Sequence, residues 1–353
     1  MSSKNGRIKI YKRRGVRLMD KGRIFRIICG FMIGVIVIIL IEMFVSDDDN
    51  TLSVDIDMTV PYSDSASWMG YLSDETYLSE LSIPGTNNSC SRYVFWGFGN
   101  RCQDTDVSQQ LKDGFRYLDL DVALDSSSEG DTVKMVNGSV DCHTDGNLFS
   151  DSLHLTDVTA DMYKFLQEHP EETVIVNLSI EDEANASKVQ DLIDSEIKSN
   201  KDYWYTGQEI PTLGEVRGKI VLARGYKANG SLEGLEMIWD KQNNKAPVDI
   251  PYDLYVNDEF RLWVQDRYNY SVEDKYEALV DGFENCEADE NTFFINFAST
   301  TGNGVFAHPR GYANNINELL LEYKFKAGTS YGIINVDFGD ENIARKIYYS
   351  NSF

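Results

Sequence analysis

The chain has 353 residues, of which 42% are hydrophobic and 25% are charged, a composition typical of a globular protein. Its formal net charge of −24 is unevenly distributed, because ten of the 33 Lys and Arg residues lie within the first 26 residues and leave the remainder with about 33 net negative charges. A body this acidic repels nucleic acid, which excludes a nucleic-acid partner, and it disfavours long-range attraction to an anionic lipid surface.

An apolar stretch from Ile24 to Val45 follows a basic amino-terminal segment, residues 1–23. About 20 apolar residues cross the hydrocarbon core of a bilayer as a helix, and Arg26 and Glu42 lie near enough to its ends to reach the headgroups. The positive segment before residues 24–45 predicts a single-pass cell-membrane protein with a cytoplasmic amino terminus and an extracytoplasmic body. A cleaved signal peptide is the alternative, which the long basic flank and the lack of a small-x-small site after Val45 disfavour.

Four cysteines lie beyond this stretch: Cys90, Cys102, Cys142 and Cys286. An even number of cysteines in an oxidising compartment permits two disulfides, in three possible pairings. The favoured pair is Cys90 with Cys102, which closes a short loop, and four free buried thiols are the alternative.

Residues 46–70 are polar and predict a solvated linker before one large domain, residues 71–353. From Tyr71 onward, short β-branched runs alternate with amphipathic segments. The predicted strands are 81–83, 116–124, 173–180, 219–223, 293–298 and 332–338. The predicted helices are 107–113, 156–168, 186–199, 272–283 and 312–323.

This alternation of strands and helices predicts an α/β fold with a mostly parallel sheet. The sequence has no glycine-rich nucleotide fingerprint and no phosphate-binding loop, so a nucleotide-binding fold has no support. The length fits an α/β barrel, in which functional residues lie at the carboxyl ends of the strands.

Polar residues gather where the predicted strands end. Asp119 and Asp121 alternate along one strand and therefore share a face, and Ser179 and Glu181 do the same at the end of another. Asn88 follows the first strand. Carboxylate and amide oxygens are the ligands that Ca²⁺ prefers, so these residues predict a calcium site, with a structural hydrogen-bond network as the alternative.

Five segments in order resemble the X region of phosphatidylinositol-specific phospholipase C, over about residues 71–353. They are 81–86 (LSIPGT), 110–119 (QLKDGFRYLD), 165–175 (FLQEHPEETVI), 211–222 (PTLGEVRGKIVL) and 332–338 (GIINVDF). The resemblance implies a distorted TIM barrel, here preceded by the single transmembrane helix. It also implies a phosphodiesterase that cleaves a phosphoinositide or a related phosphodiester by general acid and base catalysis.

The resemblance assigns roles to four residues. Asn87 stands where the family has the histidine that acts as general base, and an amide cannot take up a full proton. Asp337 matches the aspartate that supports this histidine in bacterial members, and it is the predicted replacement. His143 matches the histidine that protonates the leaving oxygen. Arg224 lies one position from a substrate-binding arginine of the family.

The resemblance also implies a calcium cofactor. Asn88, Asp119 and Asp121 match ligands of the metal-dependent members, whose fourth ligand is a glutamate at the position of Ser179. The nearest carboxylate here is Glu181, two residues further along the same face.

The sequence is compatible with two functions. One is a calcium-assisted phosphodiesterase, and the other is a surface-anchored module that binds a headgroup without turnover. The residue that divides them is Asn87. A glycerophosphodiester phosphodiesterase on a similar barrel is disfavoured, because its expected histidine–glutamate opening is missing.

Overall fold

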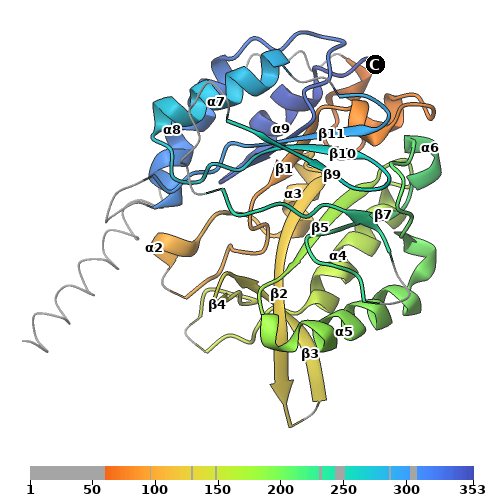
Figure 1. Cartoon of the computed structure of the whole chain (residues 1–353), viewed down its shortest axis with the longest axis vertical. Coiled ribbons are helices and arrows are strands. Elements are labelled where there is room, and N and C mark those ends of the chain that lie inside the picture. Colours follow the sequence, from red (N-terminus) through yellow and green to blue (C-terminus); the bar gives the residue numbers. More distant parts are fainter. Residues whose placement is uncertain are drawn as a thin grey trace, which may run out of the picture. The chain divides into compact units, whose positions relative to one another are not determined.

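The computed structural model describes residues 60–95, 97–128, 130–147, 149–229, 233–242, 251–285, 288–302 and 308–353. In this part of the chain, a 12-stranded sheet of mainly parallel strands is surrounded by helices in a TIM-like α/β arrangement (Figure 1). The strand order is β6-β7-β5-β2-β1-β12-β11-β10-β9, with β3 on β2, β4 on β3 and β8 on β7. The predicted α/β fold with a mostly parallel sheet is therefore confirmed.

The strands of the sheet are short, as is common in barrels. They are β1 (Ile83–Thr86), β2 (Tyr117–Ser127), β3 (Gly130–Asn137), β4 (Val140–Asp141), β5 (Val174–Ile180), β6 (Trp204–Tyr205), β7 (Ile220–Arg224), β8 (Leu235–Glu236), β9 (Asp253–Val256), β10 (Arg261–Gln265), β11 (Thr292–Phe297) and β12 (Ile333–Val336). The antiparallel pairs are β9 with β10, β2 with β3 and β3 with β4. Among the described residues, the strand order ends at β6 and β9, and no ladder joins them.

The helices cover the outer faces of the strands. They are α2 (Gly97–Asn100), α3 (Val107–Lys112), α4 (Leu155–Glu168), α5 (Ala186–Ser199), α6 (Leu213–Val216), α7 (Val272–Asn285), α8 (Pro309–Glu322) and α9 (Glu341–Tyr348), with short 3₁₀ helices at 61–63, 68–71, 78–80, 183–185 and 201–203. Figure 1 shows α4 and α5 on one side of the strands and α7, α8 and α9 on the other. The long helices fall where the sequence pattern predicted them.

Three apolar clusters form the core. The first lies between the strands themselves, in the barrel interior, and contains residues such as Ile83, Ile175 and Leu262. The second joins the outer faces of β2, β5 and β7 to α4 and α5, and the third joins β12 to α7, α8 and α9. Strands β7, β11 and β12 are thus buried on both faces, which explains their largely apolar sequences.

The predicted linker is wrong for the residues that the structure describes, because residues 60–70 pack against the barrel. Trp68 and Met69 are fully buried, and the Trp68 indole donates a hydrogen bond to the carbonyl of Gly114 (3.0 Å) and stacks on Tyr348. The burial of these two apolar residues was not predicted, because the residues around them in the sequence are polar. Residues 46–59 lie outside the described part of the chain.

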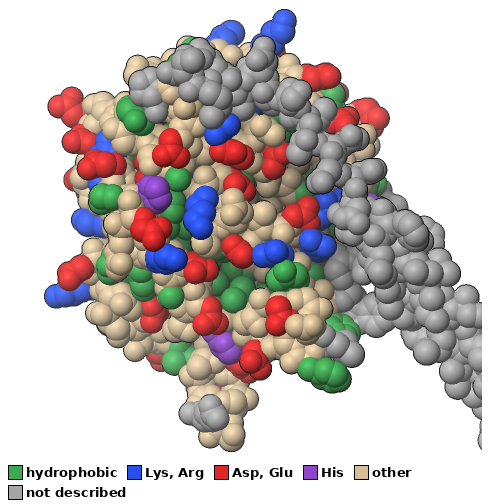
Figure 2. Space-filling model, turned by 180° about the vertical axis from the view of Figure 1, so that it is seen from behind, with side chains coloured by type: hydrophobic (Ala, Val, Ile, Leu, Met, Phe, Trp, Pro, Cys, Tyr) green, Lys and Arg blue, Asp and Glu red, His purple; other side chains and the backbone are tan. Residues whose placement is uncertain are grey.

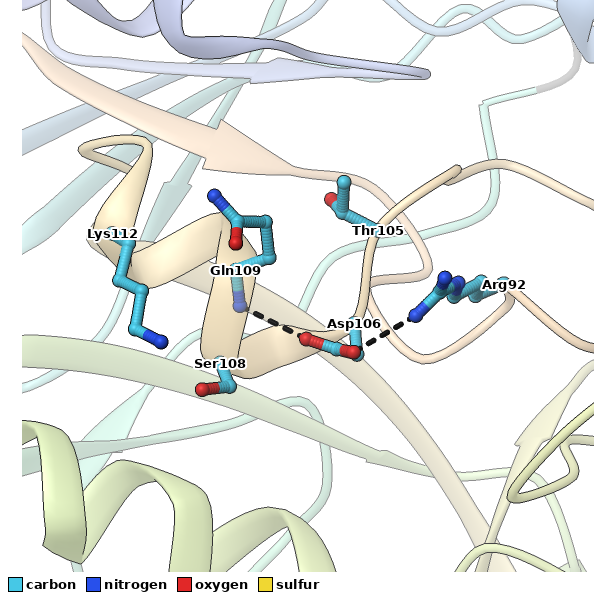
Figure 3. A pocket seen from close by; sticks show the side chains of 6 residues that line it. All are labelled: Arg92, Thr105, Asp106, Ser108, Gln109 and Lys112. Atoms are coloured by element: carbon cyan, nitrogen blue, oxygen red, sulfur yellow. Dashed lines mark hydrogen bonds and ion pairs between the residues drawn. The ribbon is translucent and has the colours of Figure 1, made fainter.

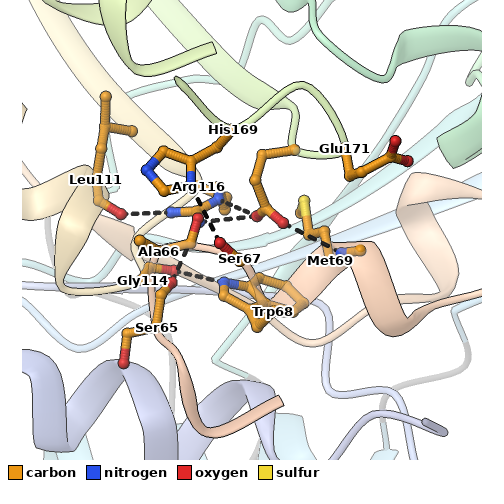
Figure 4. A network of polar contacts seen from close by, with 12 residues as sticks. Ser65, Ala66, Ser67, Trp68, Met69, Leu111, Gly114, Arg116, His169 and Glu171 are labelled. Atoms are coloured by element: carbon orange, nitrogen blue, oxygen red, sulfur yellow. Dashed lines mark hydrogen bonds and ion pairs between the residues drawn. The ribbon is translucent and has the colours of Figure 1, made fainter. Parts of the chain in front are cut away.

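A buried arginine, which forms an ion pair within the barrel, also bonds this segment (Figure 4). Arg116 is fully buried and its guanidinium contacts the Glu172 carboxylate at 2.8 Å. The same guanidinium donates hydrogen bonds to the carbonyls of Ser65 (3.2 Å) and Ala66 (3.0 Å). Burial lowers the pKa of Arg116, while Glu172 opposes that shift.

The predicted cell-membrane location is corrected by the structure. In the residues that it describes, no helix is long and apolar enough to cross a bilayer. The predicted span, residues 24–45, and the basic tail, residues 1–23, lie outside the described residues.

The favoured disulfide is also wrong. Cys90, Cys102 and Cys142 are buried free thiols, and burial raises the pKa of each. Cys286 lies outside the described residues. Three of the four cysteines therefore agree with the alternative of free buried thiols.

The surface carries charges of both signs. On the face shown in Figure 2, Asp and Glu side chains are spread among Lys and Arg, and no basic patch gathers on that face. This distribution gives nucleic acid no site of attachment on that face.

We expect Arg116→Met to lower the free energy of unfolding by about 3–5 kcal/mol, because it leaves the Glu172 carboxylate buried without its partner. The measurement is urea unfolding followed by circular dichroism. The matched control is Arg92→Met, which removes the exposed ion pair with Asp106 and should cost less than about 1 kcal/mol. Equal losses in the two variants would contradict the importance of the buried pair.

Candidate functional site

A cavity of about 560 Å³ opens at the carboxyl ends of the parallel strands. Its described lining is rich in carboxylates and amides and also includes aromatic side chains. The residues used below are Asn87, Asn88, Cys102, Asp119, Asp121, Asn177, Ser179, Glu181, Glu183, Gly225, Trp239, Lys241, Asp266, Tyr268, Phe297 and Asp337. Six of them are acidic, Lys241 is the one basic residue among the described lining, and none is histidine.

The alternation of side chains along each strand produces this lining. On β2, Leu118, Leu120 and Val122 pack against the helices. The residues between them, Asp119 and Asp121, therefore face the barrel interior. β5 repeats the pattern, because its outward residues Val176 and Leu178 alternate with the cavity residues Asn177 and Ser179.

The first strand ends in a turn that places two amides in the cavity. Asn88 has φ 44°, in the left-handed region that asparagine tolerates better than most residues. The backbone of Ser89 donates to the carbonyl of Asp119 (2.9 Å), and the Ser89 hydroxyl accepts from the Asp119 amide (3.0 Å). This turn is thus fixed to the end of β2.

Asn87 and Asp337 form a direct contact in the cavity. The Asn87 side-chain amide donates to Asp337 Oδ1 at 2.8 Å, and the Cys102 thiol also hydrogen-bonds this carboxylate. Burial raises the pKa of Asp337 to about 7, against the effect of these donors. The next residue, Phe338, has φ 49°, an uncommon conformation for a bulky residue, beside a functional side chain.

Asp119 and Asp121 are two further carboxylates in the cavity, and they lie on the same face of β2. Burial raises the pKa of Asp119 to about 7, although Asn177 donates a hydrogen bond to its Oδ1 (3.1 Å). Burial also raises the pKa of Asp121, and the charges of Asp119 and Glu181 add to this effect. Buried carboxylates in such a group require protons or a cation.

The donors of the predicted calcium site all reach the cavity. Asn88, Asp119, Asp121 and Glu181 line it, and hard oxygen donors of this kind suit Ca²⁺. In the described residues, however, no three His, Cys, Asp or Glu side chains lie close enough together to hold a metal ion. The donor chemistry fits calcium, while the acidic side chains are not gathered into a complete ligand set.

His143 and Arg224 do not line the cavity. The His143 ring lies against the carbonyl of Ser150 (3.2 Å), in the loop after β4. Arg224 is the last residue of β7, and its guanidinium bonds the carbonyls of Glu233 and Tyr226. Arg224 lies one position from the family arginine, and side chains along a strand alternate between its two faces. The Arg224 side chain therefore lies on the opposite face of the strand, and Gly225 lines the cavity instead.

Asp266, which follows β10 directly, lines the cavity but was not predicted from the sequence. Its carboxylate accepts a hydrogen bond from the Trp239 indole (3.2 Å), and burial raises its pKa to about 6. The sequence does indicate a strand here, since the apolar run 262–264 lies just before this carboxylate. Asp266 was overlooked because β10 itself was not predicted.

A second hollow of about 380 Å³ lies beside the start of α3 (Figure 3). Asp106 caps this helix by accepting a hydrogen bond from the Gln109 amide (2.9 Å), and it pairs with Arg92 at 2.8 Å. The acidic group of this hollow is therefore paired with Arg92, and its third charged residue is basic, Lys112, which distinguishes this hollow from the acidic cavity at the strand ends.

Carboxylates and amides at the carboxyl ends of barrel strands define a TIM-barrel type of active site. Residues 85–225 match the family model described as phosphatidylinositol-specific phospholipase C, X domain. This match confirms, for residues 85–225, the resemblance to the phosphatidylinositol-specific phospholipase C X-domain family found in the sequence.

Relatives and solved structures agree with this assignment. The 1-phosphatidylinositol phosphodiesterase of Listeria monocytogenes is 27% identical over 304 residues, covering 81% of this chain and 85% of the relative. The enzyme of the same name from Staphylococcus aureus is 27% identical over 316 residues, covering 81% of this chain and 94% of the relative.

The solved structure of phosphatidylinositol-specific phospholipase C from Listeria monocytogenes has a TM-score of 0.62 at 26% identity, covering 82% of this chain and 100% of that one. A Staphylococcus aureus phospholipase C structure has a TM-score of 0.67 at 22% identity, covering 83% and 99%. The second likeness supports the fold alone.

The raised pKa of Asp337 predicts a stability that depends on pH. Its folded-state pKa of about 7 lies above the value for an unfolded aspartate, about 3.9, so the folded state holds the proton more tightly. This contribution is present below about pH 4 and is lost as the pH rises through 7. We expect urea unfolding to show a smaller loss of stability over this range in Asp337→Asn than in the wild type.

The exposed variant Glu75→Gln is the control for this measurement and should follow the wild type. Identical pH dependence in Asp337→Asn and the wild type would contradict a raised pKa at this carboxylate.

Proposed function

We propose that this chain is a phospholipase C-type phosphodiesterase that cleaves phosphatidylinositol or a related phosphodiester, with turnover reduced by Asn87. The match of residues 85–225 to the family model supports the reaction class, and the relatives from Listeria and Staphylococcus are named for phosphatidylinositol. The observation that carries the proposal is the carboxylate of Asp337, which lines the cavity and has a pKa of about 7.

Asp337 is the general base in this proposal. A base works best when its pKa lies near the working pH, and burial brings this carboxylate into that range. Asn87 donates to its Oδ1 at 2.8 Å and the Cys102 thiol also hydrogen-bonds the carboxylate. A carboxylate has more acceptor sites than these two donors use, so it can also accept a hydrogen bond from a substrate hydroxyl. The hydroxyl oxygen then attacks phosphorus while its proton passes to Asp337.

The bond from phosphorus to the departing alcohol oxygen breaks in the same reaction, and that oxygen must receive a proton. His143 was the predicted donor, but its ring lies against Ser150 and outside the described lining of the cavity. We therefore assign this proton to water entering the open cavity. Losing a positioned acid and a histidine base predicts slow turnover, because each group typically contributes about 10²–10⁴-fold.

We also propose that Ca²⁺ assists the reaction and is held by Asp119 and Asp121, with Asn88 and Glu181 completing the set. The charge of Asp119 raises the pKa of Asp121, so a divalent cation would relieve the repulsion between the two carboxylates. When bound, such an ion neutralises charge on the phosphate oxygens. By holding the cation, these residues would allow the acidic cavity to accept an anionic phosphodiester.

The alternative is a headgroup-binding module without turnover, and a specific observation favours it. The base position holds Asn87, and none of the described cavity residues is histidine. Such a module would retain the lining that binds the headgroup while lacking the chemistry.

Asp337→Asn should reduce turnover of phosphatidylinositol vesicles by about 10²–10⁴-fold, because an amide cannot accept the proton. His143→Ala should change turnover less than about threefold, since its ring is outside the cavity. The measurement is release of water-soluble inositol phosphate at pH 7.5 in the presence of calcium.

Asn87→His restores the family's base next to Asp337 and separates the two functions. An increase over measurable wild-type turnover supports the proposed enzyme. Turnover that is absent from the wild type and appears only in this variant establishes the binding module instead. A large loss in His143→Ala would refute the assignment of the second proton to water.

Calcium should raise the melting temperature of the wild type but not of Asp121→Asn, because a ligand that binds only the folded state stabilises it. At 100 times its dissociation constant the gain is about 2.7 kcal/mol. The measurement is thermal unfolding with calcium or with a chelator. Magnesium is the comparison ion, and an equal shift in Asp121→Asn would place calcium elsewhere.

A further inference from the structure

Lys275 is a fully buried lysine directly behind the cavity. It lies in the first turn of α7 and has 0% exposure. Its ammonium group donates to Gln265 Oε1 and to the carbonyl of Phe297, both at 2.8 Å. Both acceptors are neutral, and none of the ion pairs between described residues includes Lys275.

The two acceptors place the ammonium group at the wall of the cavity. Gln265 is the last residue of β10 and precedes Asp266, while Phe297 ends β11 and itself lines the cavity. The Gln265 amide also bonds Asn296 (2.8 Å) and the carbonyl of Phe297 (2.9 Å). The position of the ammonium group is therefore fixed between the ends of two neighbouring strands.

The charged groups facing Lys275 come from three strands. Asp266 follows β10, Asp337 follows β12, and both act on Lys275 electrostatically. Asp119 on β2 interacts with both of these aspartates. Arg267 lies next to Asp266 and is paired with Asp253 at 2.8 Å, and its charge also lowers the pKa values of Lys275 and Asp266. The acids of the same helix turn, Glu273 and Asp274, are exposed.

A purely structural role explains this lysine poorly. Burying a cation without an ion-pair partner costs several kcal/mol, and an apolar side chain of similar size would avoid that cost. The compensation that the surroundings offer is the attraction of two carboxylates that line the cavity.

We propose that Lys275 is a positioning residue whose buried positive charge keeps Asp266 and Asp337 ionised. Its effect on the reaction rests on the proposed function, since only an ionised Asp337 can accept the substrate proton. Its effect on the two carboxylates does not depend on turnover.

The proton affinities agree with this geometry. Burial lowers the pKa of Lys275 to about 7, while Asp266 and Asp337 oppose that shift. In return, Lys275 lowers the pKa values of both carboxyls against the effect of burial. Lys275 is therefore linked to each of the two carboxyls, and both should respond to its removal.

The test is the titration of Asp266 and Asp337 by carbon-13 NMR in Lys275→Met, which keeps an unbranched side chain of similar size and removes the ammonium group. Signals are assigned with Asp266→Asn and Asp337→Asn. We expect both carboxyl pKa values to rise by about one unit or more. Lys164→Met, at an exposed position of α4, is the matched control and should leave both unchanged. Unchanged carboxyl pKa values in Lys275→Met would overturn the proposal.

Turnover supplies the second readout. In Lys275→Met, kcat at pH 6 should fall about tenfold, while kcat at pH 8.5 and KM stay within about threefold of the wild type. A uniform loss at every pH would contradict the proposed role. If the wild type has no turnover but the carboxyl pKa values rise, the proposed function fails and the role of Lys275 stands.

A reciprocal measurement applies if Lys275→Met does not fold. The pKa of the Lys275 ammonium group, followed at its Cε carbon, should fall in Asp266→Asn relative to the wild type. An unchanged lysine pKa would overturn the proposal.

Discussion

The two faces of a buried strand differ, and the site of this protein depends on that difference. On β2, β5 and β12 one row of side chains packs against helices, and the other row faces the barrel interior. Near the middle of the strands the inner row is apolar, as at Ile175 and Ile333. At the carboxyl ends the same row becomes Asp119, Asn177 and Asp337. Because the strands are parallel, their carboxyl ends meet at one end of the barrel, and the polar row becomes the lining of a single cavity.

This arrangement explains how much of the site could be predicted. Asp119 and Asp121 could be recognised because their spacing of two residues places both on one face. The same rule excludes Arg224, where one position changes the face of the strand. Asp266 could have been found in the same way, but β10 was not predicted, and a carboxylate is informative only when the strand before it is known.

Other features could not be derived from local pattern. The sequence near His143 resembles the family, yet the position of its ring depends on the path of the loop after β4, which strand periodicity does not determine. The segment around Trp68 is polar on average, and its burial depends on contacts with Gly114 and Tyr348, far along the chain. Lys275 falls in a helix with an otherwise ordinary pattern, and its burial reflects the gap between two strand ends. Long-range packing decides all three cases.

The contact between Arg116 and residues 65–66 has a consequence for where the folded domain begins. The family resemblance starts at about residue 71, but the guanidinium of Arg116 takes two of its acceptors, the carbonyls of Ser65 and Ala66, from before that point. The Glu172 carboxylate likewise accepts a hydrogen bond from the amide of Gly70 (3.1 Å). A chain cut at residue 71 would leave these buried polar groups unsatisfied and would expose the surface that Trp68 covers. The minimal folding unit is therefore longer than the segment that resembles the family, and it starts at or before Ser65.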